Sequence, residues 1–83
     1  MSRILIAEDD LFFQEFLCDV LEKQGHKVYP TPDGDVALRM LYDGKYDMVI
    51  CDMIMPNMDG MELIVAIKKT YPNMRIIAIS GGD

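Results

Sequence analysis

The segment from Asp47 to Gly60, DMVICDMIMPNMDG, decides how the rest of the sequence is interpreted. It begins with an apolar run, 47–51, that is typical of a buried strand, and Asp52 follows directly after that run. A buried carboxylate without compensation is unstable. Asp52 should therefore end in a polar cleft, pair with a cation or stay partly protonated. The remaining sequence indicates which of these applies.

Short apolar runs alternate with helical patterns along the whole chain. Strands are expected at 3–7, 27–31, 47–51 and 75–80, and helices at 11–24, 36–41 and 61–70. Pro30 places the second strand at a sheet edge, or lies at that strand's end. Strands joined by helices are parallel, with right-handed crossovers. The predicted fold class is therefore α/β, an open parallel sheet with helices on both faces.

The same patterns predict which residues are buried and which begin the helices. One apolar face of the first helix is expected to consist of Phe12, Phe13, Phe16, Leu17, Val20 and Leu21. The fourth strand, RIIAIS, has the composition of a strand buried on both faces. Asp10 and Asp59 precede helices and are predicted to cap them. Cys18 and Cys51 are predicted to be buried thiols rather than a disulfide.

Length and charge restrict the classes of function. The 83 residues fit one small domain, and the formal net charge is −6. The eight Lys and Arg residues are scattered, which argues against direct binding to nucleic acid. No apolar run has the length of a membrane span, and acidic residues stand where a signal peptide would carry its apolar core. We expect a soluble cytoplasmic protein whose partner is a basic protein surface or a metal cation.

Polar side chains follow the strands at one edge of the predicted sheet. Glu8 and Asp9 follow the first strand, Asp52 follows the third, and Ser80 ends the fourth. The carboxyl ends of parallel strands meet at the edge where open α/β folds place their sites. Three acids at one edge repel one another unless a hard cation joins them, and carboxylate oxygens are the ligands that Mg²⁺ prefers. Beside such an ion, Asp52 could also attack a phosphoryl group.

The same residues allow other interpretations. Asp52 could be an ordinary loop acid, but the acids and the hydroxyl at the same edge favour a functional site. An EF-hand loop starting at Asp52 is excluded because Ile54 and Pro56 stand at ligand positions. Met53, Met55, Met58 and Met61 could form an adaptable contact surface or fill the core, and the sequence leaves both open.

Three segments of the chain resemble one known family. The segments ILIAEDD, VICDMIMPNMDGMELI and RIIAISGGD are similar to those of the receiver domain of two-component response regulators, and the similarity extends over the whole chain. It implies that Asp52 is the phosphoacceptor and that Asp9 and Asp52 ligate Mg²⁺ directly. It also implies that Glu8 ligates the ion through water and that the backbone carbonyl of Ile54 is a further ligand. Ser80 would be the switch hydroxyl.

Receiver domains of this family contain further helices and strands beyond those predicted in these 83 residues. Receivers of this type continue through another helix, a fifth strand that ends in a lysine, and a last helix. We therefore expect a single truncated receiver domain at 1–83, flavodoxin-like, with strand order 2-1-3-4. The missing lysine is expected to impair phosphorylation. The fourth strand would then be a sheet edge, so we expect a homo-oligomer that covers this edge.

Three functions remain on the sequence alone. The first is a signalling receiver that takes phosphate from a sensor histidine kinase or a phosphotransfer protein. The second is a docking or assembly module that binds a kinase or itself without being phosphorylated. The third is an enzyme that works through an aspartyl phosphate, and it is not favoured because no second general acid is evident beside Asp52.

Overall fold

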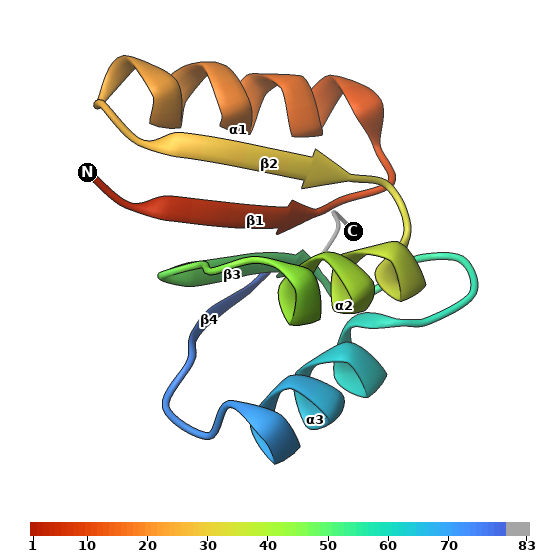
Figure 1. The fold of residues 1–83 in the computed structure, drawn as a ribbon. Helices are drawn as coiled ribbons and strands as arrows, with labels where there is room; N and C mark the ends of the chain where they lie inside the picture. Colours follow the sequence, from red (N-terminus) through yellow and green to blue (C-terminus); the bar gives the residue numbers. More distant parts are fainter. Residues whose placement is uncertain (80–83) are drawn as a thin grey trace.

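The computed structural model describes residues 1–79. Strands and helices alternate from β1 to β4, as the sequence predicts (Figure 1). The elements are β1 (Arg3–Ala7), α1 (Leu11–Lys23), β2 (Lys27–Thr31), α2 (Gly34–Asp43), β3 (Met48–Asp52), α3 (Gly60–Thr70) and β4 (Arg75–Ile79). Most predicted boundaries are correct to within two residues, and β3 includes Asp52 as its last residue. Each described helix is too short or too polar to span a membrane.

The four strands form one parallel sheet in the order β2-β1-β3-β4. The predicted fold class and strand order are confirmed. Ala7, the last residue of β1, pairs with Thr31 of β2 on one side and with Cys51 of β3 on the other. Pro30 lies in β2 at the edge of the sheet, where its missing N–H leaves no bond of the sheet unmade.

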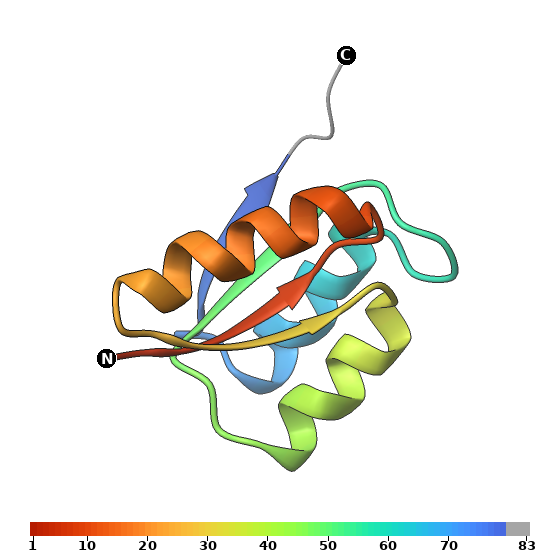
Figure 2. The same cartoon turned by 90° about the horizontal axis from the view of Figure 1, so that it is seen from above.

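Helices cover both faces of the sheet. Figure 1 shows α1 on one side and α2 and α3 on the other, and Figure 2 shows α1 crossing over the central strands. Side chains alternate along a strand, so each face has its own core. The core under α1 contains Ile4, Ile6 and Ile50, with Leu17, Cys18 and Leu21 packed against it. The core under α2 and α3 contains Leu5, Ala7, Ala37, Leu41, Val49, Cys51, Met55, Leu63 and Ile67.

An aspartate begins each helix. The Asp10 carboxylate accepts hydrogen bonds from the Phe12 and Phe13 amides, and the Asp59 carboxylate accepts one from the Glu62 amide. These caps satisfy amide groups that have no partner inside the helix, and each contributes about 1 kcal/mol of stability. The predicted capping roles of Asp10 and Asp59 are confirmed.

The expected apolar face of α1 is partly wrong. Phe12 is 89% exposed and Phe16 is 60% exposed, while Leu17, Cys18 and Leu21 face the sheet. Phe12 and Phe16 are four residues apart, so they lie on one side of the helix, and that side points away from the sheet. Apolar residues surround most of this helix, so periodicity alone could not select the buried side.

Two further expectations about burial need correction. In β4, Arg75, Ile77 and Ala78 are exposed, although the composition of the strand indicated burial on both faces. The reason is that β4 pairs only with β3 among residues 1–79 and that no described helix covers its outer part. Cys18 is half-buried rather than buried, whereas Cys51 is fully buried, and both thiols are free.

Candidate acidic site

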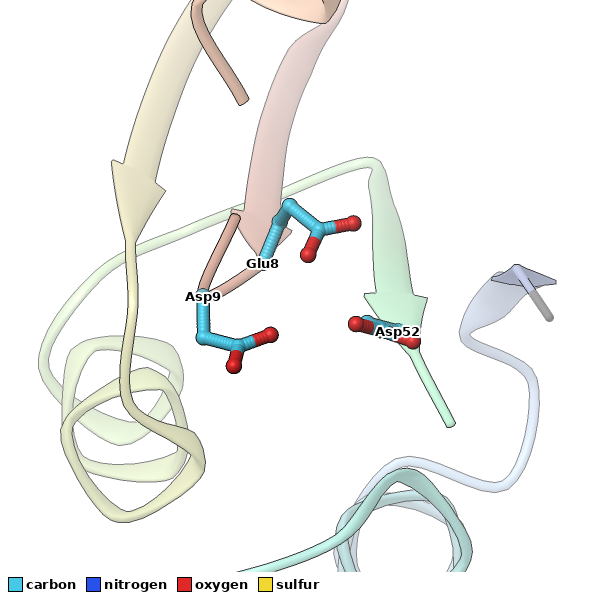
Figure 3. A group of neighbouring side chains, drawn as sticks. All are labelled: Glu8, Asp9 and Asp52. Atoms are coloured by element: carbon cyan, nitrogen blue, oxygen red, sulfur yellow. The ribbon is translucent and has the colours of Figure 1, made fainter. Parts of the chain in front are cut away.

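The site forms where β1 and β3 end side by side. Ala7 pairs with Cys51, so Glu8, which follows β1, and Asp52, the last residue of β3, lie at the same level. Asp9 follows Glu8 immediately. Figure 3 shows the carboxyl groups of Glu8 and Asp9 directed toward Asp52. The parallel register therefore brings Glu8 and Asp52 side by side, and Asp9 joins them because it follows Glu8.

The three carboxyl groups are close and unequally exposed. Oxygen atoms from Glu8, Asp9 and Asp52 all lie within 4.8 Å of one another. Glu8 is 3% exposed and Asp52 is 5% exposed, whereas Asp9 is open to solvent. A ligand would therefore enter from the side of Asp9 and meet the two buried carboxyl groups behind it.

Burial changes the acidity of Glu8. Removal from water raises the pKa of the Glu8 carboxyl group from 4.5 to about 7. The Asp10 amide lowers this pKa by donating to Glu8 Oε2 at 3.0 Å, while contact with Asp52 and the charges of Asp52 and Asp9 raise it. The site thus holds more negative charge than its surroundings compensate.

Backbone hydrogen bonds fix the two buried acids in place. The Glu8 amide donates to the Thr31 carbonyl at 3.0 Å, and the Gln14 side-chain amide donates to the Glu8 carbonyl at 3.0 Å. The Ile54 amide donates to Asp52 Oδ1 at 3.1 Å. Glu8 is therefore held by β2 and α1, and Asp52 by the loop that follows it.

Gly60 allows the chain to fold back against Asp52. A Cβ atom at this position would overlap the Asp52 carbonyl oxygen and the Met53 Cα atom. The Gly60 amide donates to the Met53 carbonyl at 3.0 Å, which closes the loop 53–59. Burial, with the nearby charge of Asp52, raises the pKa of the Cys51 thiol to about 11. Cys51 is therefore a neutral core side chain beside the site.

The donor set fits a hard divalent cation. Three carboxylates at one edge of the described chain supply oxygen ligands, and the raised pKa of Glu8 shows that a positive charge there would be favourable. Mg²⁺ takes one or two carboxylates and completes its coordination with water and substrate oxygens. Asp9 and Asp52 offer such ligands, and the solvent-exposed position of Asp9 leaves room for water.

The predicted site residues have different outcomes. The structure brings Glu8, Asp9 and Asp52 together, as their positions at the strand ends indicated. It places the Ile54 amide against Asp52, while the role of the Ile54 carbonyl as a ligand stays a prediction. Ser80, the predicted switch hydroxyl, lies outside the described residues.

Sequence reasoning missed the residues that support the site. Thr31 and Gln14 hold the backbone of Glu8, and Asn57 donates to Asp33 at 2.8 Å across two loops. Thr31 ends β2 beside Ala7, so its position in the predicted sheet could have signalled its role. The contact between Asn57 and Asp33 had no periodic signal, because both residues lie outside the strands and helices.

The fold and the site define a class of protein. An open parallel sheet in the order β2-β1-β3-β4, with acids at the carboxyl ends of its central strands, is the flavodoxin-like α/β arrangement. Residues 4–83 match the sequence model of the response regulator receiver domain. The chain therefore belongs to the response regulator receiver domain family.

Curated relatives match over nearly all of this chain. It is 39% identical over 79 residues to the DNA-binding transcriptional regulator NtrC of Azospirillum brasilense, covering 95% of this chain and 16% of that protein. It is 37% identical over 81 residues to the response regulator receiver protein CpdR of Brucella abortus (strain 2308), covering 98% of this chain and 68% of that protein. The chain thus spans a small part of NtrC and about two thirds of CpdR.

Solved structures share the fold. The response regulator protein TrrA of Thermotoga maritima, in complex with Mg²⁺-BeF, matches with a TM-score of 0.94 and 31% identity, over 100% of this chain and 72% of that chain. A second structure, of the histidine kinase ThkA in complex with TrrA, contains a match with a TM-score of 0.92, 31% identity and the same coverage.

Proposed function

We propose that this domain is the phosphoacceptor receiver of a two-component system and that Asp52 accepts the phosphoryl group. The observation that carries this proposal is the cluster of Glu8, Asp9 and Asp52 at one sheet edge, within 4.8 Å, in a chain of the receiver family. Asp52 stands opposite the other two acids, which both come from the end of the neighbouring strand β1 and direct their carboxyl groups toward it.

We infer a binding arrangement for Mg²⁺ that uses the chain's own residues. Asp9 and Asp52 would ligate the ion directly, Glu8 would ligate it through water, and Ile54 would offer its backbone carbonyl. When bound, Mg²⁺ would neutralise the carboxylates and the phosphoryl oxygens. The structure of TrrA with Mg²⁺-BeF supports this assignment, since that receiver has the same fold.

The transfer step follows from the position of Asp52. An oxygen of the Asp52 carboxylate attacks the phosphorus of a phosphohistidine, an O–P bond forms and the N–P bond breaks. The electron pair of the broken bond returns to the imidazole nitrogen of the donor. The Ile54 amide, which donates to Asp52 Oδ1, orients the carboxylate for this attack. Ser80 would then donate its hydroxyl to a phosphoryl oxygen.

The partner in this reaction is a sensor histidine kinase or a phosphotransfer protein. The structure of ThkA bound to TrrA supports a kinase partner, because TrrA shares the fold of this chain. The net charge of −6 supports a protein partner over direct contact with nucleic acid. We place the reaction in the cytoplasm and treat the domain as a phosphorylated carrier rather than an enzyme.

A second function is favoured by the outer side of α1. Leu11, Phe12 and Phe16 are exposed there, which is unusual for large apolar side chains on a small domain. Such a surface suits a docking or assembly module that binds a kinase, or a second copy of the chain, without phosphorylation. Kinase binding that persists in the variant Asp52→Ala at unchanged affinity would favour this docking function.

Binding of beryllofluoride tests the leading function, since this anion mimics a phosphoryl group on an aspartate. Fluorine NMR should show a bound signal that requires Mg²⁺ and disappears on chelation. The variant Asp52→Asn should give no bound signal, while circular dichroism shows that it is folded. A signal that persists in Asp52→Asn, or no signal from the folded wild-type chain, would contradict phosphorylation at Asp52.

A further inference from the structure

The loop 53–59, which follows Asp52, is tied to the start of α2. Asn57 Nδ2 donates to Asp33 Oδ2 at 2.8 Å. The other oxygen of the same carboxylate, Asp33 Oδ1, accepts from the Asp35 amide at 2.8 Å and caps α2. Asp33 therefore uses one oxygen for its own helix and the other for the loop that carries the proposed phosphorylation site.

The backbone of Asn57 is suited to this link. Its φ angle is 70°, in the left-handed region, which asparagine adopts more readily than most residues. The pKa of the Asp33 carboxyl group is lowered, and the hydrogen bond from Asn57 is the largest cause. Asp33 is consequently ionised at neutral pH, and a charged acceptor makes the stronger hydrogen bond.

A second contact joins the same two segments. A Cβ atom at Gly34 would lie 2.6 Å from the carbonyl oxygen of Met58, so this backbone approach requires glycine. Gly34 follows Asp33, and Met58 follows Asn57. The loop 53–59 thus contacts the first turn of α2 through two consecutive residues. These two contacts fix the position of the loop along α2 as well as its distance from the helix.

Little freedom remains between this contact and Asp52. The Ile54 amide is bonded to Asp52 Oδ1, and Met55 is buried in the core. Pro56 has a fixed φ angle, and its carbonyl accepts from the Met58 amide at 2.8 Å. A displacement of Asn57 would therefore be passed along a short, stiff segment to Ile54.

We propose that Asp33 and Asn57 are positioning residues of the acidic site, and that their hydrogen bond keeps Ile54 against Asp52 with its carbonyl available to Mg²⁺. The metal-binding half of this inference rests on the proposed function. The half that concerns the Ile54 amide does not, because it applies to the metal-free chain. Neither Asp33 nor Asn57 belongs to the residues that would touch the ion.

The variant Asn57→Gly tests the link with little backbone strain, because glycine also adopts a positive φ angle. It removes only the donor. Asn73→Gly is the matched control, since Asn73 is an exposed loop residue after α3 and the same change affects the unfolded chain equally. Asp33→Ser is a second test, because serine still caps a helix but lacks the second oxygen.

The first measurement is amide hydrogen exchange by NMR in the metal-free chain. Exchange at Ile54 should become about tenfold faster in Asn57→Gly and Asp33→Ser, with core amides such as that of Leu5 unchanged. Mg²⁺ affinity, from the shifts of the same amides, should fall about tenfold, as is usual when a supporting residue is lost. Asn73→Gly should match the wild-type chain in both measurements.

A reversal of donor and acceptor provides the rescue. Asn57→Asp alone places two carboxylates against each other and should accelerate Ile54 exchange at least as much as Asn57→Gly. Combining it with Asp33→Asn restores one donor and one acceptor, and should restore both Ile54 protection and Mg²⁺ affinity to within about twofold. If the single variants acted only by disturbing the structure, swapping the amide and the carboxylate would not restore Ile54 protection or Mg²⁺ affinity.

The possible results separate the two proposals. Ile54 exchange that is unchanged in Asn57→Gly, or that rises equally at Ile54 and Leu5, overturns the positioning role. If Ile54 exchange is faster in the variants but the wild-type chain binds no Mg²⁺, the positioning role is supported and the proposed function is contradicted. Selective loss at Ile54, together with weaker Mg²⁺ binding and rescue by the double variant, supports both.

Discussion

The carboxyl group of Glu8 contacts that of Asp52, and both groups are buried at the end of the central strands. Two acids in this arrangement cannot both be ionised without a free-energy cost, unless a cation joins them. Burial is the largest cause of the raised pKa of Glu8, about 7, and contact with Asp52 and the charges of Asp52 and Asp9 raise it further. The site therefore opposes the stability of the metal-free domain and favours a bound cation, which gives measurable consequences.

We expect the metal-free chain to lose stability as pH rises from about 4.5 to about 7 through this group. The folded state holds the Glu8 proton up to about pH 7, whereas the unfolded chain releases it near pH 4.5, so folding takes up a proton between these values. The loss reaches up to about 3 kcal/mol. Urea unfolding of wild type and Glu8→Gln at several pH values measures it, because glutamine cannot titrate. Parallel pH profiles of the two chains would contradict the assignment.

Mg²⁺ should stabilise the wild-type chain at pH 7. At a free concentration one hundred times its dissociation constant, a ligand that binds only the folded state adds about 2.7 kcal/mol. Asp9→Asn should remove most of this gain while leaving the metal-free stability within about 0.5 kcal/mol, since Asp9 is exposed. Thermal unfolding with Mg²⁺ or with chelator measures both quantities. Asp19→Asn, an exposed control in α1, should keep the full gain.

Gly60→Ala should be among the most destabilising single substitutions at the site. The added methyl group would overlap backbone atoms of Asp52 and Met53, which cannot move without displacing β3, and we expect a loss of about 3 kcal/mol. Gly25→Ala is the control, because its φ angle of 91° is strained for alanine but no atom lies within 4 Å. That change should cost about 1 kcal/mol. Equal urea midpoints for the two variants would exclude the predicted overlap.

Truncation of a buried apolar side chain and of an exposed one on the helices should have different effects on stability. Leu63 is fully buried between α3 and the sheet, so Leu63→Ala should cost about 2–5 kcal/mol. Phe12→Ala should change stability by less than about 0.5 kcal/mol, because the ring is exposed. Denaturant unfolding of both variants tests the corrected orientation of α1. A loss near 3 kcal/mol in Phe12→Ala would place that ring in a core.

Self-association of the 83-residue chain through β4 stays a prediction. Ile77 is 48% exposed, and β4 pairs only with β3 among the described residues. An exposed apolar edge strand is a template for pairing with a second chain, and a charge on it prevents such pairing. Sedimentation at tens of micromolar should therefore show dimers or larger species of the wild type, and monomers of Ile77→Lys. A monomeric wild-type chain would contradict this interface.

The sequence was sufficient for the sheet and for the acids at its edge. The strands are short apolar runs separated by helical patterns, and parallel connections leave few arrangements, so the strand-end positions of Glu8, Asp9 and Asp52 predicted their meeting. The strand order came with the family resemblance. These features depend on patterns that repeat along the chain.

Two kinds of feature could not be predicted. The buried side of α1 was assigned wrongly in part, because Phe12 and Phe16 are as apolar as Leu17 and Leu21 and only packing on the sheet distinguishes them. The bond between Asn57 and Asp33 joins two loops that are remote in the sequence. Loop residues carry no periodicity, so their contacts are known only when the chain has folded.

The placement of β1 at the centre of the sheet has a consequence for synthesis on the ribosome. The first strand to emerge needs β2 on one side and β3 on the other, and all of α1 and α2 must follow before β3 arrives. Glu8 and Asp9 therefore have no contact with Asp52 until the ribosome has synthesised the chain beyond that residue. The cation binding that we propose for this site can begin in a nascent chain only at that point, so it would report the moment at which the long-range pairing of β1 with β3 is completed.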